Sequence, residues 1–423
     1  MRAVYTFILY LLTPLIVLRL YWKSWRLPAY RHRIGERFVL KAGLISPVDV
    51  WVHAVSLGEV VAAVPLINAL LGRGLRVMVT TMTPTGSQQV INRFGDRVSH
   101  QYVPYDLPCV LRRFFKKINP RLGIIMETEL WPNLIFQATQ LNIPLLLVNA
   151  RLSDRAYQQY VKFRRFFKPV LNQFMMILAQ SEEDARRFVE LGATPERVSV
   201  GGNIKFDMPS VVIDAALQSH FKMAWGQERV VVIAASTHEN EEEQILSRWA
   251  LLKKAIPDVL LLIAPRHPER FQTVYQLCPQ YQLTTGLRSN ASTIDRNVEV
   301  IVLDSLGELS LFYSLSDYAF VGGSLVPIGG HNVLEAIALN VPVLCGPYMN
   351  NAQSVCDELC AADAMIQVAN GDELIDKLIA LHQNPERRMM QINRAMAVLK
   401  ANQGTLSKCM EEVDSVIGSP GAA

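Results

Sequence analysis

The stretch DYAFVGGSLVPIGGHNVLEAIALNVPVLCGP, residues 317–347, decides the fold. It begins with a short apolar run that ends at Gly322-Gly323 and continues through a second glycine-bearing loop. A helix is expected from about His331-Asn332, and a second apolar run covers 341–347. This order predicts a βαβ unit with two parallel strands. The loops that follow the strands of such a unit lie at the carboxyl edge of the sheet, where open α/β sheets bind their ligands.

The same pattern recurs on both sides of this stretch. Apolar runs occur at 49–55, 75–81, 122–127, 143–150 and 174–180, and again at 229–236, 258–265, 298–304, 317–323 and 341–347. Continuous apolar strands are typical of parallel sheets buried on both faces, and helix-length stretches separate most of these runs. The pattern lapses between Gly201 and about residue 225, which includes Pro209. We therefore expect two doubly wound α/β domains facing a central cleft, residues 38–205 and 206–423.

Composition narrows the function classes. Half of the 423 residues are apolar, and 42 basic residues nearly balance 38 acidic ones, for a net charge of +4. Such a chain is not disordered as a whole, and no nucleic-acid partner is expected. The six cysteines form no CxxC pair and have no histidine at metal-ligand spacing. We expect reduced, mostly buried thiols and no metal site.

The N-terminal segment, residues 1–37, is typical of a membrane anchor. Ala3 to Leu18 carry no charge, and a basic and aromatic stretch follows. An uncharged run with cations behind it predicts an anchor whose basic side is cytoplasmic. The run is short for a bilayer span of about 20 residues, and Pro14 would kink it. A spanning helix and an interfacial helix both remain open. A buried core helix is a third reading, against which Trp22 and Trp25 argue.

The first candidate for chemistry is Glu59 in HAVSLGE, residues 53–59. The strand 49–55 ends there, and Gly58 allows the backbone to turn into a helix. A carboxylate at this helix start is expected to be kept ionised by the helix dipole and can accept a proton. The alternative is that Glu59 only complements the dipole.

A second acidic loop, METELWPN, follows the strand that begins at residue 122. Glu127 and Glu129 are two residues apart, so in an extended chain they point to the same side. Next to Glu59 they could orient it or stabilise developing positive charge. The alternative is a solvated loop beside a buried Trp131. After the next strand come Arg151 and Asp154, so both charge signs are expected at this edge.

Cations and small polar residues mark the remaining loops. Lys205 in GGNIKFD could meet a phosphate or be solvated, and Arg266 in APRHPER has a planar fork suited to phosphate unless it makes a surface ion pair. The loop AASTHENEEE, residues 234–243, is read as a helix cap with acids in the first turn. The helix expected near His331 offers free N–H groups to a phosphate, and Glu335 could accept hydrogen bonds from a ribose diol.

Taken together and in order, HAVSLGE, METELWPN, NARLSDR, GGNIKFD, PRHPER, LGEL and GGHNVLEA resemble one family. It is the family of Kdo transferases, glycosyltransferases of the GT-B fold that place 3-deoxy-D-manno-octulosonic acid (Kdo) on the lipid A precursor. The resemblance extends from the anchor to about residue 350. It implies an enzyme with CMP-Kdo as donor, lipid IVA as acceptor, inversion of the anomeric centre and no cofactor. It also implies an N-terminal acceptor-binding domain and a C-terminal nucleotide-sugar-binding domain.

The resemblance assigns roles to individual residues. Glu59 corresponds to the catalytic base, and Glu129 and Lys205 correspond to positions that stabilise the transition state. The segments implied in CMP-Kdo binding comprise Pro265, Arg266, Leu306, Gly307, Glu308, Asn332, Val333, Leu334 and Glu335. The leaving group is already a stable anion, so it needs positive potential and requires no metal.

The expected setting is the cytoplasmic face of a bacterial inner membrane. RRFFKK at 112–117 and the stretch 155–168 mix cations with aromatics, which suits a headgroup layer and a phosphorylated lipid, although ordinary amphipathic helices have the same pattern. Two alternatives remain. A nucleotide-sugar epimerase of the same fold would need no anchor, and a non-catalytic membrane-tethered nucleotide-sugar binder would need no Glu59.

Overall fold

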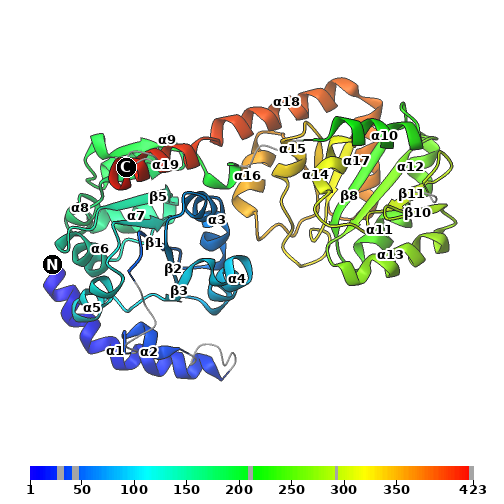
Figure 1. The fold of residues 1–423 in the computed structure, drawn as a ribbon. Coiled ribbons are helices and arrows are strands. Elements are labelled where there is room, and N and C mark those ends of the chain that lie inside the picture. The colour runs from blue at the N-terminus through cyan, green and yellow to red at the C-terminus, as the bar shows by residue number, and fades with distance from the viewer. Residues whose placement is uncertain (26–32, 41–46, 208–212, 291–293, 419–423) are drawn as a thin grey trace. The chain divides into compact units, whose positions relative to one another are not determined.

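The chain forms two compact units, each built on one sheet. The computed structural model describes residues 1–25, 33–40, 47–207, 213–290 and 294–418. Unit 1 comprises residues 1–207 and 402–423, and unit 2 comprises residues 208–401. Each unit has a seven-stranded sheet in which neighbouring strands run parallel, with helices on both faces (Figure 1). The expectation of two doubly wound parallel-sheet units is confirmed.

The sheet of unit 1 has the order β3-β2-β1-β4-β5-β6-β7. Its strands are β1 (Val50–His53), β2 (Val77–Thr81), β3 (Ser99–Tyr102), β4 (Leu122–Met126), β5 (Leu145–Ala150), β6 (Met176–Ala179) and β7 (Val198–Val200). Side chains of β1 alternate between two apolar clusters. Trp51 belongs to one, and Val50 and Val52 belong to the other. The sheet is therefore buried on both faces, which explains why its central strands are continuously apolar.

Ten helices belong to unit 1 in the part of the chain that the structure describes. They are α1 (Arg2–Ser24), α2 (Ile34–Arg37), α3 (Leu57–Gly72), α4 (Pro84–Phe94), α5 (Pro108–Ile118), α6 (Pro132–Gln140), α7 (Asp154–Lys162), α8 (Arg164–Leu171), α9 (Glu182–Glu190) and α19 (Thr405–Ile417). Three of them, α4, α5 and α6, start with a proline. Proline fits this position because the first helical N–H has no partner within the helix.

The sheet of unit 2 has the order β10-β11-β9-β8-β12-β13-β14. Its strands are β8 (Val231–Thr237), β9 (Leu260–Pro265), β10 (Thr285–Leu287), β11 (Val300–Val302), β12 (Tyr318–Val321), β13 (Val343–Cys345) and β14 (Ile366–Gln367). Its helices are α10 (Ala215–Trp225), α11 (Glu241–Leu246), α12 (Trp249–Ala255), α13 (Phe271–Leu277), α14 (Leu309–Ser314), α15 (Leu334–Ile337), α16 (Gln353–Ala361), α17 (Gly371–Gln383) and α18 (Pro385–Asn402).

All ten apolar runs form strands, and the four strands not predicted are β3, β7, β10 and β14. These four are the outermost strands of the two sheets. An outermost strand has a neighbour on one side only, so it need not be a continuous apolar run, which is the pattern by which the others were recognised. The sequence SHQY of β3 illustrates this.

The C-terminal tail differs from the expected division, which placed all of 206–423 in one domain. Residues 402–423 belong to unit 1. The Asp207 carboxylate accepts hydrogen bonds from the backbone N–H groups of Gly404 and Leu406, both at 2.7 Å. Cys409 and Met410 of α19 pack into an apolar cluster of unit 1. Apolar burial and these contacts hold the tail on unit 1, and no motif in the sequence announced them.

Some expectations concern residues outside the described ranges. These are residues 26–32 of the basic and aromatic stretch and the neighbourhood of Pro209. The expectation that the cysteines are mostly buried is confirmed, because four of the six are buried, Cys360 is partly buried and Cys109 is exposed.

Candidate active site

Glu59 stands where β1 passes into α3, and its carboxylate is held at both oxygens. Ser56 is the N-cap of α3, and its hydroxyl donates to Glu59 Oε1 at 2.8 Å. The backbone N–H of Val55 donates to Oε2 at 2.8 Å. This reciprocal arrangement is a variant of the capping box, whose S-x-x-E spacing is visible in Ser56-Leu57-Gly58-Glu59. The helix-end role considered for Glu59 is therefore real.

Glu59 is not an ordinary capping residue, because it is buried. Its exposed fraction is 7%. Burial, followed by the negative charge of Glu129, raises the pKa of Glu59 to about 7. Desolvation outweighs the two hydrogen bonds that favour the ionised form, so the carboxylate is not kept fully ionised as expected. At neutral pH, comparable fractions of Glu59 are ionised and able to accept a proton, or protonated and able to donate one.

The second acidic loop lies beside Glu59. Glu127 adopts a left-handed backbone, with φ of +54°, so the chain turns here and is not extended as expected. Both acids still act on the site, since the charges of Glu129 and Glu127 each raise the pKa of Glu59. Glu129 Oε2 accepts a hydrogen bond from Trp131 Nε1 at 2.6 Å, while burial raises the pKa of Glu129. The loop is thus a fixed, half-buried part of the site and not a solvated one.

An aromatic layer lies next to these acids. His53, at the end of β1, is fully buried, and its ring is 5.5 Å from that of Trp131 and 5.6 Å from that of Trp51. Its Nδ1 lies 2.9 Å from Thr80 Oγ1. Burial lowers the pKa of His53 to about 4, so its ring is neutral. His53 therefore positions Trp131, which in turn holds Glu129.

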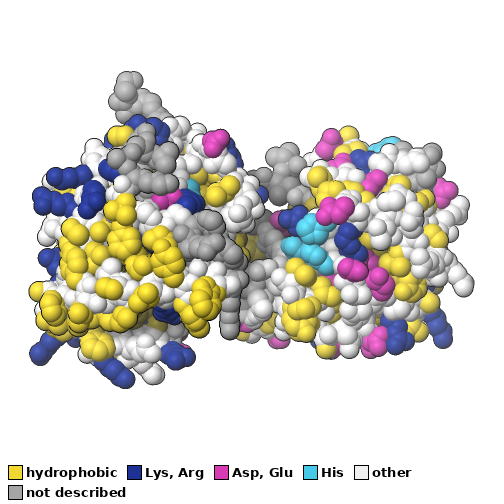
Figure 2. Space-filling view, turned by 90° about the horizontal axis from the view of Figure 1, so that it is seen from below, with side chains coloured by type: hydrophobic (Ala, Val, Ile, Leu, Met, Phe, Trp, Pro, Cys, Tyr) yellow, Lys and Arg dark blue, Asp and Glu magenta, His cyan; other side chains and the backbone are white. Residues whose placement is uncertain are grey.

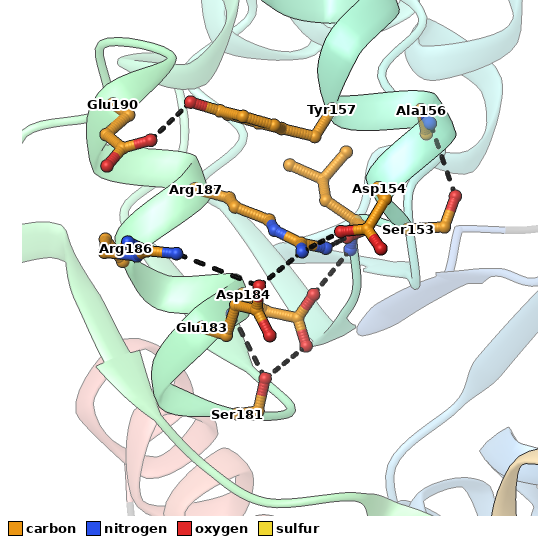
Figure 3. A network of polar contacts seen from close by, with 11 residues as sticks. Ser153, Asp154, Ala156, Tyr157, Ser181, Glu183, Asp184, Arg186, Arg187 and Glu190 are labelled. Atoms are coloured by element: carbon orange, nitrogen blue, oxygen red, sulfur yellow. Dashed lines mark hydrogen bonds and ion pairs between the residues drawn. The ribbon is translucent and has the colours of Figure 1, made fainter. Parts of the chain in front are cut away.

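The loop after β5 carries ion pairs that stabilise the structure (Figure 3). Asp154 pairs with Arg187 of α9, which also pairs with Glu183. Asp184 accepts a hydrogen bond from Leu152 N at 2.7 Å. These contacts join α7 to α9, and the charge of Asp154 is paired within unit 1.

Lys205 also belongs to unit 1. It lies on a short 3-10 turn, Ile204–Phe206, whose two apolar residues are fully buried. The side chain of the buried Asn149 accepts a hydrogen bond from Ile204 N at 3.0 Å. This turn packs against α3, the helix that carries Glu59. Lys205, Glu59 and Glu129 are therefore all placed by one unit.

In unit 2, one pocket opens at the carboxyl edge of the sheet. It collects residues from the carboxyl ends of β8 and β9 and from the segments after β9 and β11, namely Ser236, Ala264, Pro265, Arg266, Leu303, Ser305, Leu306, Gly307, Glu308, Leu309 and Phe312. The structure thus brings together the PR and LGE segments, which are about 40 residues apart in sequence. Among the described residues that line this pocket, none comes from 332–335.

Two ion pairs fix the loops that line the pocket. Arg270 makes the ion pair of the PRHPER loop, with its Nη1 2.6 Å from Oε1 of the fully buried Glu242. The Arg266 side chain is exposed, while its backbone N–H donates to Thr237 O at 3.0 Å. In the LGEL loop, Glu308 pairs with Arg288 at 2.8 Å.

Glu241 is the residue whose role the sequence did not reveal. Its carboxylate is fully buried and accepts four backbone hydrogen bonds, from His238, Gly323, Ser324 and Leu325, at 2.7 to 2.9 Å. The expected acids occupy the first turn of α11, but the helix begins after Asn240, whose side chain makes no cap hydrogen bond, so the expected cap is not formed. Glu241 acts as a clamp, because it holds the glycine loop after β12 against the loop after β8. Only an acceptor without a hydrogen of its own satisfies four N–H donors.

Three histidines meet above this clamp, from the loops after β8, β9 and β12. The Nε2 atoms of His238 and His331 are 2.9 Å apart, and the rings of His238 and His267 are 5.3 Å apart. Burial, with the neighbouring His238 and Arg266, lowers the pKa of His331 to about 4. Gly323, with φ of +66°, lets the chain pass the His331 ring, which would lie 3.0 Å from a Cβ. Figure 2 shows histidine, basic and acidic side chains side by side on unit 2.

The helix after this loop is shorter than expected. Helix α15 starts at Leu334, not near His331, and has four residues. One turn has little dipole, so the short helix gives little support to the predicted helix-end phosphate site. Asn332 Nδ2 donates to Glu335 Oε1 at 3.1 Å, and burial raises the pKa of Glu335. The two polar residues of HNVLEA therefore work as a pair.

Comparison with known proteins places these residues in a family. A family model described as 3-deoxy-D-manno-octulosonic-acid transferase (kdotransferase) matches residues 32–208. The chain is 39% identical to a 3-deoxy-D-manno-octulosonic acid transferase of Haemophilus influenzae over 417 residues, which cover 97% of each chain. The chain belongs to the Kdo transferase family. A second relative of that name, from Bordetella pertussis, is 34% identical over 99% of this chain and 100% of its own.

One solved structure is similar to part of the chain. The C-terminal CMP-Kdo binding domain of WaaA from Acinetobacter baumannii is 38% identical, with a TM-score of 0.42, over 44% of this chain and 96% of that one. Family membership makes the chain a glycosyltransferase. The structure divides the implied residues of this Kdo transferase between its two units, with Glu59, Glu129 and Lys205 in unit 1 and the nine others in unit 2.

Proposed function

We propose that the chain transfers Kdo from CMP-Kdo to the lipid A precursor lipid IVA, with inversion at the anomeric carbon. Glu59 is the general base. The single observation that carries the assignment of the base is the environment of Glu59, which is buried, fixed at both carboxylate oxygens and raised in pKa to about 7. A general base is most effective when its pKa is near the working pH.

The reaction requires one proton acceptor. A lipid hydroxyl oxygen attacks the anomeric carbon and forms the new glycosidic bond, while its proton passes to the Glu59 carboxylate. The bond from that carbon to the phosphate oxygen breaks, and its electron pair leaves with CMP. Because CMP leaves as a stable anion, no protonated acid is needed at the leaving oxygen, in contrast to glycoside hydrolysis. Attack and departure on opposite faces invert the centre.

The neighbouring charges fit this chemistry. In the transition state the sugar acquires positive character, which the buried Glu129 carboxylate stabilises, and Lys205 supplies a cation for the departing phosphate. In unit 2, the pocket of Pro265, Arg266 and residues 306–308 receives the nucleotide. The paired Asn332 and Glu335 exchange hydrogen bonds with the polar groups of the nucleotide.

We place this reaction at the cytoplasmic face of a bacterial inner membrane. The supporting observation is α1, of which Arg2–Trp22 is long and apolar enough to cross a membrane by length and composition. A membrane surface is also where a lipid acceptor is found.

The test is a reconstituted reaction. Purified full-length protein is incubated with CMP-Kdo and detergent-dispersed lipid IVA, and the lipid is analysed by mass spectrometry. We expect lipid carrying Kdo and an equal amount of CMP, and NMR of the product should show an inverted anomeric centre. Donor isomerised without acceptor would indicate an epimerase, and donor bound without turnover would indicate a binding protein. Either result refutes the proposal.

A further inference from the structure

Helix α1 exposes apolar side chains on the face where a surface helix of a soluble protein exposes polar ones. The side chains that face unit 1 repeat at helical spacing and include polar residues such as Arg2, Tyr5, Thr6 and Thr13. The side chains that face outward are almost all apolar. An ordinary surface helix turns its apolar stripe to the core and its polar face to water. This arrangement also excludes the buried core helix considered from the sequence.

The first turns of α1 are held on unit 1 by specific contacts. Tyr5 Oη donates to Asp106 Oδ2 at 2.8 Å, and Thr6 Oγ1 donates to Asn133 Oδ1 at 3.0 Å. Asp106 is itself 7% exposed and also accepts from Asn133 N. Arg2 lies over the Phe136 ring of α6, 4.3 Å from its centroid.

The rest of the helix is held as well. Tyr10 Oη donates to Cys109 Sγ of α5 at 3.1 Å. Farther along, Leu9, Ile16 and Leu20 pack against an apolar cluster of unit 1, and Ser24 is 5% exposed. Contacts therefore run from Arg2 to Leu20. These contacts would have to break for α1 to cross a bilayer.

The outward face of α1 forms one apolar strip. Its exposed side chains are Val4, Phe7, Ile8, Leu11, Leu12, Leu15, Leu18, Tyr21 and Trp22. The helix has 23 residues and is thus about 34 Å long. Figure 2 shows hydrophobic side chains gathered on this face of unit 1, with Lys and Arg at the border. So large an exposed apolar surface marks an interaction site.

Cations flank the strip on the helices that α1 touches. On α5, next to Cys109, the exposed cations are Arg112, Arg113 and Lys116. On α8, whose Phe166 ring lies 5.7 Å from that of Tyr5, Arg164 and Arg165 are exposed. Apolar side chains bordered by cations complement the acyl layer and the anionic headgroups of a phospholipid bilayer.

We propose that α1 lies in the plane of the membrane, with its apolar strip in one leaflet, and does not span the bilayer. The proposal rests on the proposed membrane location of the enzyme and makes that location more specific. The protein is then monotopic, and the strip of α1 together with the cations of α5 and α8 is the surface that binds anionic lipid. Its N-terminus stays on the same side of the membrane as the two units, whereas a spanning α1 would carry Met1 to the opposite side.

The first test locates the N-terminus. A short epitope is placed before Met1 or, as a control, after Ala423, and inside-out inner-membrane vesicles are treated with protease. We expect both epitopes to be removed at similar rates without detergent. An N-terminal epitope that is protected until detergent is added, while the C-terminal one is removed, overturns the proposal. Kdo transfer to detergent-dispersed lipid is measured in parallel, so a failure of the proposed function is recognised separately.

The second test asks whether α1 stays docked in the membrane. In Tyr10→Cys the new thiol faces Cys109, and a short bifunctional maleimide added to membranes should join the two, as read from linked tryptic peptides. In the control Leu15→Cys the thiol is on the outward face and should not be joined to Cys109. Absence of the Tyr10→Cys link in membranes, together with its presence in detergent, would mean that α1 leaves unit 1 to insert.

The third test measures binding to vesicles of phosphatidylethanolamine and phosphatidylglycerol. Replacing Leu11, Leu15 and Leu18 by Ser should weaken binding by roughly 10²-fold or more, given the apolar area lost. Replacing exposed Met223 and Leu251 of unit 2 by Ser is the matched control and should change little. Equal effects of the two sets would show that the strip is not the lipid-binding surface.

The cations are tested in the same assay. Reversing Arg112, Arg113 and Lys116 to Glu should weaken binding to these vesicles by roughly 10²-fold at low salt, with a smaller effect at high salt. Reversal of Lys222 and Lys254 in unit 2 is the control. Vesicle binding that is unchanged in the α5 variant would refute the role of the basic border.

Discussion

Because Glu59 is buried, its ionisation should change the stability of the folded protein, whereas the ionisation of an exposed glutamate should change it little. Glu59→Gln keeps the size of the side chain and can keep the S-x-x-Q form of the capping box, but it removes the ionisable group. The pKa of Glu59 is raised from its ordinary value of 4.5 to about 7. Between these values the folded protein holds a proton that the unfolded chain releases. The stabilisation is therefore fully present below the unfolded pKa and is lost as pH rises through about 7.

The size of the effect follows from the same shift. At 1.36 kcal/mol per unit, the rise in pKa corresponds to roughly 3 kcal/mol of unfolding free energy. The side chain is 7% exposed, so solvent screening reduces this little. Wild type should lose about 2–3 kcal/mol more unfolding free energy than Glu59→Gln when the pH is raised from 4.5 to 8.

The assay is urea-induced unfolding of both proteins in detergent at several pH values, followed by tryptophan fluorescence. The variant Glu182→Gln is the matched control, because Glu182 is an exposed first-turn glutamate of α9. Its effect on stability should be small at every pH. If the difference between wild type and Glu59→Gln is the same at pH 4.5 and pH 8, Glu59 is not desolvated and the reasoning about its pKa fails.

Three further predictions concern the rest of the site. The charge of Glu129 raises the pKa of Glu59, but burial contributes more. Glu129→Gln should therefore move the acidic limb of the pH profile of kcat/KM from about pH 7 to lower pH, by at most about one unit. An unmoved limb would mean that Glu129 does not influence the pKa of the catalytic base. Arg266→Ala and Glu335→Ala should each raise the KM for CMP-Kdo by roughly one to two decades and that for the lipid much less, as initial rates would reveal; unchanged donor KM in both would remove them from the donor site. Activity should persist in excess chelator, since cations of the chain serve the phosphate; loss that magnesium reverses would contradict this.

The sequence predicted the interior of both sheets and missed their borders. Apolar runs such as 122–127 and 258–265 become central strands because burial on both faces requires continuous apolar side chains. Edge strands such as β7 and β10 have three residues each and carry no such pattern. The attachment of α19 to unit 1 depends on packing between segments about 200 residues apart, which no local pattern encodes.

The sequence identified the residues of the site better than it predicted their burial and protonation. The position of Glu59 behind Gly58 was evident, but its raised pKa depends on burial and on Glu129, which come from the fold. The clamp formed by Glu241 was hidden because acids in a first helical turn are common and their backbone partners here lie about 80 residues away. The outward apolar face of α1 also needed the structure, since an uncharged run does not state which of its faces is docked.

The central claim, that Glu59 is the general base, is tested most directly by the turnover of Glu59→Gln. The variant and wild type are compared at pH 8 with saturating CMP-Kdo and detergent-dispersed lipid IVA, and donor affinity is measured separately by calorimetry. We predict a fall in kcat of roughly 10²–10⁴-fold, with donor affinity changed less than about threefold. A variant that keeps most of its turnover would contradict the account, and Glu59 would then be only the capping residue of α3.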